Sequence, residues 1–316
     1  MGITSLALLS QRFGWPLYLE IFSHFQVQYF IATLLLAGLT LLLHHFRSLL
    51  LVLFCGAVLS AQVIPWYVPS TVNKPAANLR VLLANLNANN SDATQTLALM
   101  DTEQPDLALF IEVGEPMGKR LKQLKKSFPY GTDLAADSGI VLYSKYPLTD
   151  VQTQPFGLHT RDSLLAHLEI NGQPLSFIAS HPLPPTAHEL FQSRNTVLAD
   201  VAQYANTQTD PIVLLGDLNV TMWSPYYQDL IHKTGLKNSR QGFGIQPSWP
   251  TNTYHYGLQN VPQTLLRPLQ IPIDHCLVSP EITVTGIHTG AETGSDHLPV
   301  IADLWIDANS LARSQI

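Results

Sequence analysis

The sequence predicts an α/β domain with many strands, preceded by a pair of membrane-spanning helices. Three observations lead to this prediction. Two long uncharged apolar windows lie near the N-terminus, nine apolar runs of strand length lie between residues 79 and 306, and helical patterns separate several of those runs. With 316 residues, the chain is long enough for one large α/β domain or two ordinary ones.

The first expected element is a transmembrane helical hairpin within residues 1–68. Arg47 is the only Lys, Arg, Asp or Glu between Glu20 and Lys74, and the spans are expected at about 27–43 and 49–68. A bilayer needs about 20 mostly apolar residues per helix. Two alternatives are a pair of buried core helices and a cleaved signal peptide. The first is disfavoured by the short "HHFR" joint and the interface-type "PWY" after the second run, the second by the late start of the first run.

An even number of spans places both ends of the hairpin on one side of a membrane. Arg47 in the short loop favours a cytoplasmic loop and an extracytoplasmic C-terminal domain, whereas Lys74 and Arg80 favour the reverse. We expect a multi-pass membrane protein with an extracytoplasmic domain and with membrane lipid as the hairpin's partner. No protein partner can be inferred.

The expected domain follows a Pro-punctuated linker at 69–78, occupies residues 79–306 and ends in a tail at 307–316. Its strand-like runs are "LRVLLANL", "DLALFIEV", "GIVLYS", "SLLAHLEI", "LSFIASH", "IVLLGDL", "IDHCLVS", "ITVTGIH" and "LPVIADLW". Its helical patterns are "SDATQTLALMDTE", "MGKRLKQLKKSF", "HELFQSRNTVLADVAQYAN" and "SPYYQDLIHKTG". Cys55 in the second span and Cys276 in a strand are too different in environment to form a disulfide.

The charge of the domain argues against a partner that is a long polyanion. After residue 74 the chain carries 14 basic and 22 acidic residues, a formal charge of −8, whereas proteins that bind nucleic acid usually present a basic face. The only dense basic run, "KRLKQLKKS" (119–127), fits an amphipathic helix with Leu121 and Leu124 turned inward and the lysines solvated.

Polar side chains gather where the apolar runs begin and end, an arrangement that places a site on one rim of the sheets. They are Asn85 and Asn87 after the first run, Glu112 at the end of the second, His181 after the fifth, Asp217 and Asn219 after the sixth, Asp274 in the seventh, and Asp296 with His297 before the last. Each residue alone has an ordinary interpretation, since "GDLN" after a strand is a common turn and a histidine before "PLPP" a common loop residue.

Together these residue types suit hydrolysis by a metal-activated water, because no serine or cysteine nucleophile accompanies them. Glu112 and Asp296 are the hard oxygen ligands that Mg²⁺ or Mn²⁺ prefers, and Asp217 can take a proton from the attacking water. Asn85 and Asn219 can hold water, carboxylate or phosphate without adding charge. His181 and His297 can donate to phosphoryl oxygens, and Asp274 is the candidate to fix the His297 tautomer.

The order of the motifs resembles that of the endonuclease/exonuclease/phosphatase superfamily, whose members include DNase I-like nucleases, sphingomyelinases and inositol polyphosphate phosphatases. The resemblance covers residues 79–306 and implies a two-sheet α/β sandwich with its site on one rim. It places Asn85 on the active-site asparagine, Glu112 on the metal-binding glutamate, His181 on the phosphate-contacting histidine, Asp217 and Asn219 on "GDxN", Asp296 and His297 on "SDH", and Asp274 on the supporting aspartate. A looser match places Arg161 on a substrate-side arginine.

The substrate is left open by the resemblance. A nuclease acting on a phosphodiester is the family default. The alternative is a phosphatase or phosphodiesterase for a lipid headgroup or lipid-linked pyrophosphate, because "GDLNVTMWSPYYQDL" and "SRQGFGIQPSWP" look like the membrane-anchored branch. In that branch Arg240 and Trp249 would line the substrate cleft, although a loop anchored by a buried Trp explains them equally well. A non-catalytic tethered binding module is the third possibility, disfavoured because every expected position is filled.

Overall fold

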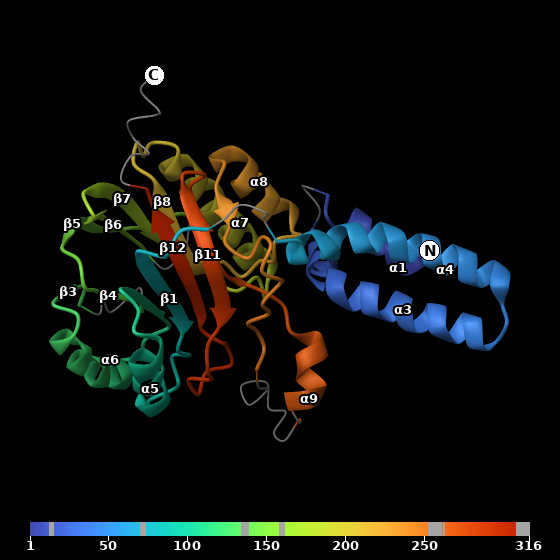
Figure 1. Cartoon of the computed structure of the whole chain (residues 1–316), viewed down its shortest axis with the longest axis horizontal. Helices are drawn as coiled ribbons and strands as arrows, with labels where there is room; N and C mark the ends of the chain where they lie inside the picture. The colour runs from blue at the N-terminus through green and yellow to red at the C-terminus, as the bar shows by residue number, and fades with distance from the viewer. Residues whose placement is uncertain are drawn as a thin grey trace.

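The computed structural model describes residues 1–12, 16–69, 74–133, 139–157, 162–251, 261 and 263–307. Figure 1 shows an α/β sandwich from which a pair of long helices projects on one side. The predicted fold class is confirmed. Arg161, the linker's "STVN" segment and nearly all of the tail lie outside the described residues.

Two six-stranded mixed sheets form the sandwich. The first has the order β11 (Ile282–Thr289), β12 (Val300–Ile306), β1 (Leu79–Asn85), β2 (Leu107–Ile111), β4 (Val141–Ser144) and β3 (Tyr130–Gly131). The second has the order β5 (Leu148–Gln154), β6 (Ser163–Ile170), β7 (Gln173–Ala179), β8 (Ile212–Asp217), β10 (Asp274–Val278) and β9 (Lys237–Asn238). Strands β1 and β2 are parallel, as are β7 and β8, so their carboxyl ends share an edge.

The alternation of side chains along each strand separates three apolar layers. Leu83 and Leu215 face the other sheet and pack in the central core, whereas Leu82 and Leu214 face outward under helices. The first sheet is covered by α5 (Thr94–Glu103) and α6 (Glu115–Leu121), and the second by α7 (His188–Ala205) and α8 (Pro225–Thr234). Burial on both faces explains why the central strands are continuous apolar runs.

Three strands, β3, β5 and β9, were not predicted. Strand β5 is the clearest case, because its residues are polar and largely exposed. It lies at an edge of its sheet and pairs with β6 through the backbone, so its side chains need no apolar pattern. The basic run is helical as predicted, α6 continuing into the 3₁₀ helix η3 (Lys122–Lys126), with Leu121 and Leu124 buried.

Two of the N-terminal helices are long and apolar enough to cross a membrane, by length and composition. The region contains α1 (Gly2–Leu9), α2 (Leu17–Glu20), η1 (Ile21–Phe25), α3 (Gln26–Leu42), α4 (Phe46–Val63) and η2 (Ile64–Tyr67). Leu17–Leu42 has a mean hydropathy of 1.7 and Phe46–Tyr67 of 2.1, with 17% and 22% of the respective windows buried. Helices α3 and α4 pack on each other. Their low burial disagrees with the core-helix alternative.

Candidate active site

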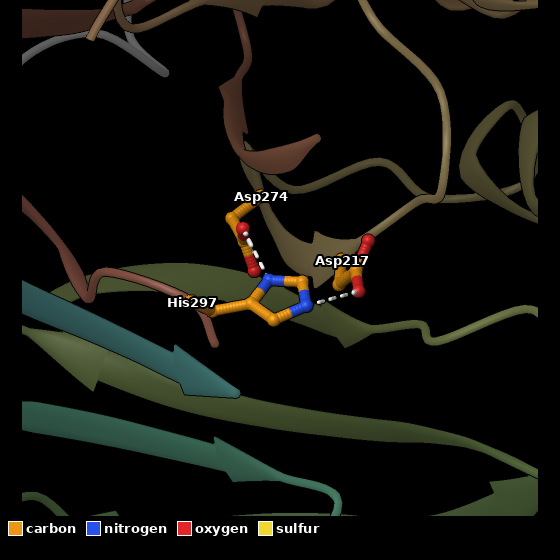
Figure 2. Close-up of side chains that lie close together, drawn as sticks. All are labelled: Asp217, Asp274 and His297. Carbon is orange, nitrogen blue, oxygen red and sulfur yellow. Dashed lines mark hydrogen bonds and ion pairs between the residues drawn. The ribbon is translucent and has the colours of Figure 1, made fainter. Parts of the chain in front are cut away.

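The predicted site residues meet at one rim of the sandwich, where strands of both sheets end. Asp217 at the end of β8 and Asp274 at the start of β10 are direct partners in an antiparallel pair. Asn85, the last residue of β1 in the other sheet, donates from Nδ2 to Asp217 Oδ2 at 3.3 Å. His297, in the loop before β12, lies between the two aspartates (Figure 2).

Gly216 explains how Asp217 reaches its neighbours. A Cβ at this position would lie 1.8 Å from the backbone oxygen of Ser180, so only glycine allows β8 to pass this close to the chain leaving β7. The same approach brings His181 alongside, and its Nδ1 donates to the backbone oxygen of Asp217 at 3.1 Å. The glycine of "GDLN" is therefore part of the site's construction and more than a turn residue.

His297 is held as a cation by the acids around it. Its Nδ1 lies 2.9 Å from Asp274 Oδ2, and its Nε2 lies 3.8 Å from Asp217 Oδ2 (Figure 2). Burial alone would lower the pKa of His297, but the charge and hydrogen bond of Asp274, followed by the charges of Asp217 and Asp296, raise it to about 10. The imidazolium is therefore the main form at neutral pH.

The two buried aspartates are shifted in opposite directions. Burial, followed by the nearby charge of Asp274, raises the pKa of Asp217 to about 6, against the opposing effect of His297 and His181. Burial would also raise the pKa of Asp274, but the charge and hydrogen bond of His297 outweigh it and lower the pKa. The pair therefore separates into Asp274, whose ionised form is favoured, and Asp217, which can take up a proton near neutral pH.

Glu112 and Asp296 lie at the edges of this cluster. Glu112 Oε1 contacts His181 Nε2 at 3.0 Å, and its side chain is 22% exposed whereas that of His181 is buried. Asp296 accepts from Asn87 Nδ2 at 2.8 Å and from Trp249 Nε1 at 3.1 Å. Of the two predicted metal ligands, Glu112 thus joins the cluster through His181, and Asp296 joins it through Asn87.

Asn87 belongs to the site, although from the sequence it was placed at the rim without being given a role. Besides its bond to Asp296, its backbone N–H donates to Asn85 Oδ1 at 3.0 Å. The signal was its position two residues beyond Asn85 at the same strand end. Asn219 instead holds Asp217 and a neighbouring loop. Its backbone N–H donates to Asp217 Oδ1 at 2.9 Å, and its Nδ2 donates to the backbone oxygen of Pro182, in the loop after β7, at 3.0 Å.

Three residues of the rim have left-handed backbone conformations that non-glycine residues rarely adopt. The φ angles are 59° at Asn87, 53° at Glu112 and 51° at Asn219. Each directly follows or nearly follows a strand end. Such strain gathers at functional sites, where the surrounding contacts hold it in place.

The expectation that Arg240 lines an open cleft is not met. Its side chain has no exposed surface, and its Nε and Nη2 donate to the backbone oxygen of Gln246 at 3.3 and 3.2 Å. Its charge acts on Asp274 from inside the protein and helps to lower that residue's pKa. Trp249 is only partly buried and lies at the rim, with its ring 6.3 Å from that of His297.

The chemistry of the donor set fits a divalent cation. Ligand atoms of Asp217, Asp274 and His297 lie within 4.8 Å of one another, so this group could hold a metal ion. Four carboxylates stand at the rim against two histidines and the buried Arg240, and Asp274 Oδ1 is buried with no hydrogen-bond donor among the described residues. Carboxylate oxygens in such excess are what a hard cation compensates.

Comparison with known families agrees with this geometry. Residues 78–297 match the endonuclease/exonuclease/phosphatase family. The chain belongs to this family. Among curated proteins, none matches the chain.

Solved structures of similar fold come from several sources. An endonuclease/exonuclease/phosphatase from Beutenbergia cavernae is 21% identical with a TM-score of 0.56, over 73% of this chain and 72% of the other. D. rerio TDP2, complexed with single strand DNA product, is 16% identical with a TM-score of 0.57, over 72% and 98%. A Bacteroides thetaiotaomicron mannosyl-6-phosphatase is 17% identical with a TM-score of 0.53, over 72% and 100%. At these identities the likeness establishes the fold.

Proposed function

We propose that this protein is a divalent-metal-dependent phosphoesterase anchored in a membrane, acting on a phosphoester carried by a lipid. The observation that carries the proposal is the carboxylate-rich rim, in which Asp217 with a pKa of about 6 stands beside the cationic His297. A base near neutrality next to a fixed cation suits proton abstraction from water during attack on an anionic phosphoester.

Glu112 and Asp296 are the proposed ligands of a Mg²⁺ or Mn²⁺ ion. Both nitrogens of the His297 imidazolium carry protons, so this ring has no lone pair for a cation. The carboxylates at the edges of the cluster are therefore the better ligands. When bound, the ion would neutralise phosphoryl charge and stabilise the leaving oxygen.

The remaining residues have roles that follow from their contacts. Asp217 would take the proton of the attacking water, while His297 and His181 donate to phosphoryl oxygens. Asp274 would hold His297 in orientation through its bond to Nδ1. Asn85 and Asn219 would position Asp217, since the side chain of one and the backbone N–H of the other already donate to its carboxylate.

A lipid substrate is favoured by how the apolar helices meet the site. The short α9 (Gln263–Leu266) and η5 (Arg267–Leu269) lie on the side from which the hairpin projects (Figure 1). Gln28 in α3 donates to the backbone oxygens of Pro268 and Gln270 at 3.0 and 3.2 Å. Leu265 and Leu269 are 64% and 53% exposed. A bilayer that surrounds the hairpin would also meet these leucines.

That segment leads directly to the rim. Ile271 and Trp249 exchange backbone hydrogen bonds at 3.1 and 2.6 Å, and Trp249 donates to Asp296. A short path of bonded residues therefore connects the proposed membrane surface to a proposed metal ligand. We propose that a lipid headgroup enters along this side, from the extracytoplasmic face that Arg47 in the loop between the spans favours.

Nucleic acid is the second candidate, as the family default. The basic residues of α6 and η3 give it limited support, because two of the five already pair with acids, Lys119 with Glu115 and Lys125 with Asp133. The two candidates, and the non-catalytic module, separate in one panel assay. Full-length protein in bilayer discs with Mg²⁺ or Mn²⁺ is offered plasmid DNA, RNA, sphingomyelin, a polyprenyl pyrophosphate and a chromogenic phosphodiester.

The proposal expects turnover of a lipid-borne compound in excess of nucleic acid. His297→Ala should lower that turnover by about 10²–10³-fold, as removal of a group that stabilises developing charge does. His288→Ala is the matched control, because His288 pairs with Glu103 away from the rim. If DNA nicking exceeds lipid hydrolysis, the nuclease hypothesis is favoured over the lipid phosphoesterase. If no compound is turned over, the non-catalytic binding module is favoured.

A further inference from the structure

The apolar helices are bonded to the loop that carries the catalytic residues. Glu20, the only acidic residue among the first 91, has no exposed surface. Its Oε1 lies 3.3 Å from Arg194 Nη2 of α7, whose side chain is also fully buried. A carboxylate and a guanidinium buried this deeply depend on each other's charge.

Arg194 extends the contact to the catalytic loop. Its Nη1 donates to the backbone oxygen of Asn219 at 2.8 Å, and its Nε donates to Asn195 Oδ1 at 2.8 Å. The guanidinium also lies over the rings of Phe191 and Tyr226, at 5.2 and 5.7 Å. These three polar partners and two aromatic rings fix the orientation of the planar guanidinium.

Glu20 reaches the same loop by a second route. Ser224, which caps the start of α8, donates from Oγ to Glu20 Oε1. His24 follows one helical turn later, with Nε2 3.4 Å from Glu20 Oε2 and Nδ1 3.0 Å from Thr221 Oγ1. Loop residues 219, 221 and 224 are thus each bound to the N-terminal region, directly or through Arg194.

The end of α4 contacts the same loop. Trp223 Nε1 donates to the backbone oxygen of Gln62 at 2.9 Å. Val63 packs in the apolar layer that also contains Val220 and Met222. The loop "LNVTMWS" is therefore held between the sheet that presents Asp217 and the base of the hairpin.

We infer that Glu20, acting through Arg194, is a positioning residue for Asp217 and Asn219, so that the docked hairpin is part of the catalytic architecture and more than a tether. The route is short. Arg194 fixes the carbonyl of Asn219, the left-handed conformation of Asn219 turns its N–H toward Asp217, and that N–H holds the Asp217 carboxylate. This inference rests on the proposed phosphoesterase activity for one of its readouts.

The test uses the full-length chain in bilayer discs. Glu20→Gln keeps the shape and removes the charge. We expect kcat on the chromogenic phosphodiester to fall by about ten- to a hundredfold, the effect of a small misplacement of a reacting group, with KM nearly unchanged. Because Glu20→Gln leaves Arg194 buried and uncompensated, Arg194→Lys is the second variant. Lysine keeps the charge but lacks the fork that reaches Glu20 and Asn219 together.

Hydrogen exchange supplies a readout that does not depend on activity. Peptides spanning 216–224 should exchange faster in Glu20→Gln and Arg194→Lys than in wild type, whereas peptides of β1 should not change. Gln28→Ala is the matched control, because it removes contacts of the same hairpin to residues 268 and 270 only. It should leave exchange in 216–224 unaltered.

The outcomes separate the two proposals. Unchanged kcat and unchanged exchange in both loop variants, beside an active wild type, would overturn the inference and leave the phosphoesterase standing. Faster loop exchange with an unchanged kcat would also overturn it. An inactive wild type with faster loop exchange in both variants would overturn the phosphoesterase and keep the coupling of hairpin and loop.

Discussion

The rim of the sandwich and the base of the hairpin are both clusters of largely buried charged side chains, but they differ in the balance of acids and bases. The base of the hairpin consists of Glu20, His24 and Arg194. At the base, Glu20 is matched by Arg194 and His24. At the rim, the four carboxylates of Glu112, Asp217, Asp274 and Asp296 stand against His181, His297 and the charge of the buried Arg240 behind Asp274. The charges of the base are matched one to one, whereas the carboxylates of the rim outnumber the cations near them. The difference agrees with the proposals that the rim binds a cation and a substrate and that the base positions the loop beside it.

The largest effect is expected when the proposed general base at the rim, Asp217, is removed. Asp217→Asn should lower turnover by about 10²–10⁴-fold, the usual contribution of a general base. The unfolding temperature should hold or rise, because the change removes the repulsion from Asp274 that raises the pKa of Asp217. Asp229→Asn, which loosens only an exposed pair with Lys233, is the control. Comparable turnover in both variants would mean that Asp217 is not the base.

Disrupting the charged cluster at the base of the hairpin should instead lower the stability of the protein. Glu20→Gln is expected to lower the free energy of unfolding by about 3–5 kcal/mol, because it leaves the Arg194 guanidinium buried without its counter-charge. Chemical denaturation of the full chain in detergent measures this loss. If Glu20→Gln unfolds at the same denaturant concentration as wild type, the base cluster is not the structural element described here.

A smaller effect is expected when the rim loses one proposed ligand of the ion. Glu112→Gln should raise the Mg²⁺ or Mn²⁺ concentration needed for half-maximal turnover by about 10–100-fold. At saturating ion, the turnover should approach that of wild type. An unchanged ion requirement would exclude Glu112 as a ligand of the ion.

The smallest effect concerns pH. The base must be ionised to act, and burial with the charge of Asp274 raises the pKa of Asp217 to about 6, so turnover should fall about tenfold per pH unit below that value. The folded state holds the Asp217 proton more tightly than the unfolded chain does, so this residue's contribution to stability decreases as pH rises from its ordinary 3.8 toward 6. A flat rate between pH 5 and 7 would contradict the assignment.

The rim was predictable from the sequence because its residues mark the ends of apolar strands. Asp217, for example, follows four apolar residues and a glycine, a local pattern that carries the signal by itself. The pairing of Asp274 with Asp217 across β8 and β10 depends on the order and register of the strands and was not predicted. The apolar windows likewise predicted the two long helices through their composition alone.

The base of the hairpin was not predictable in this way. Arg194 lies in an amphipathic helical pattern where a charged residue is expected to be solvated, and its burial depends on how α7 packs against α8 and the N-terminal helices. Arg240 misled for the same reason, since its sequence neighbours indicate a loop and only the fold places it behind Asp274. Strand β5 pairs through its backbone at a sheet edge, so its composition carries no strand signal.

The central claim is that the excess carboxylates of the rim bind a divalent ion for phosphoester hydrolysis. It is tested most directly by stripping the full-length protein with EDTA and titrating Mg²⁺ or Mn²⁺ against turnover of the panel substrates, in wild type and Asp217→Asn. We predict no turnover without the ion, saturable recovery in wild type and no recovery in the variant. Equal turnover with and without the ion, or recovery of the variant to the wild-type rate, would contradict the account.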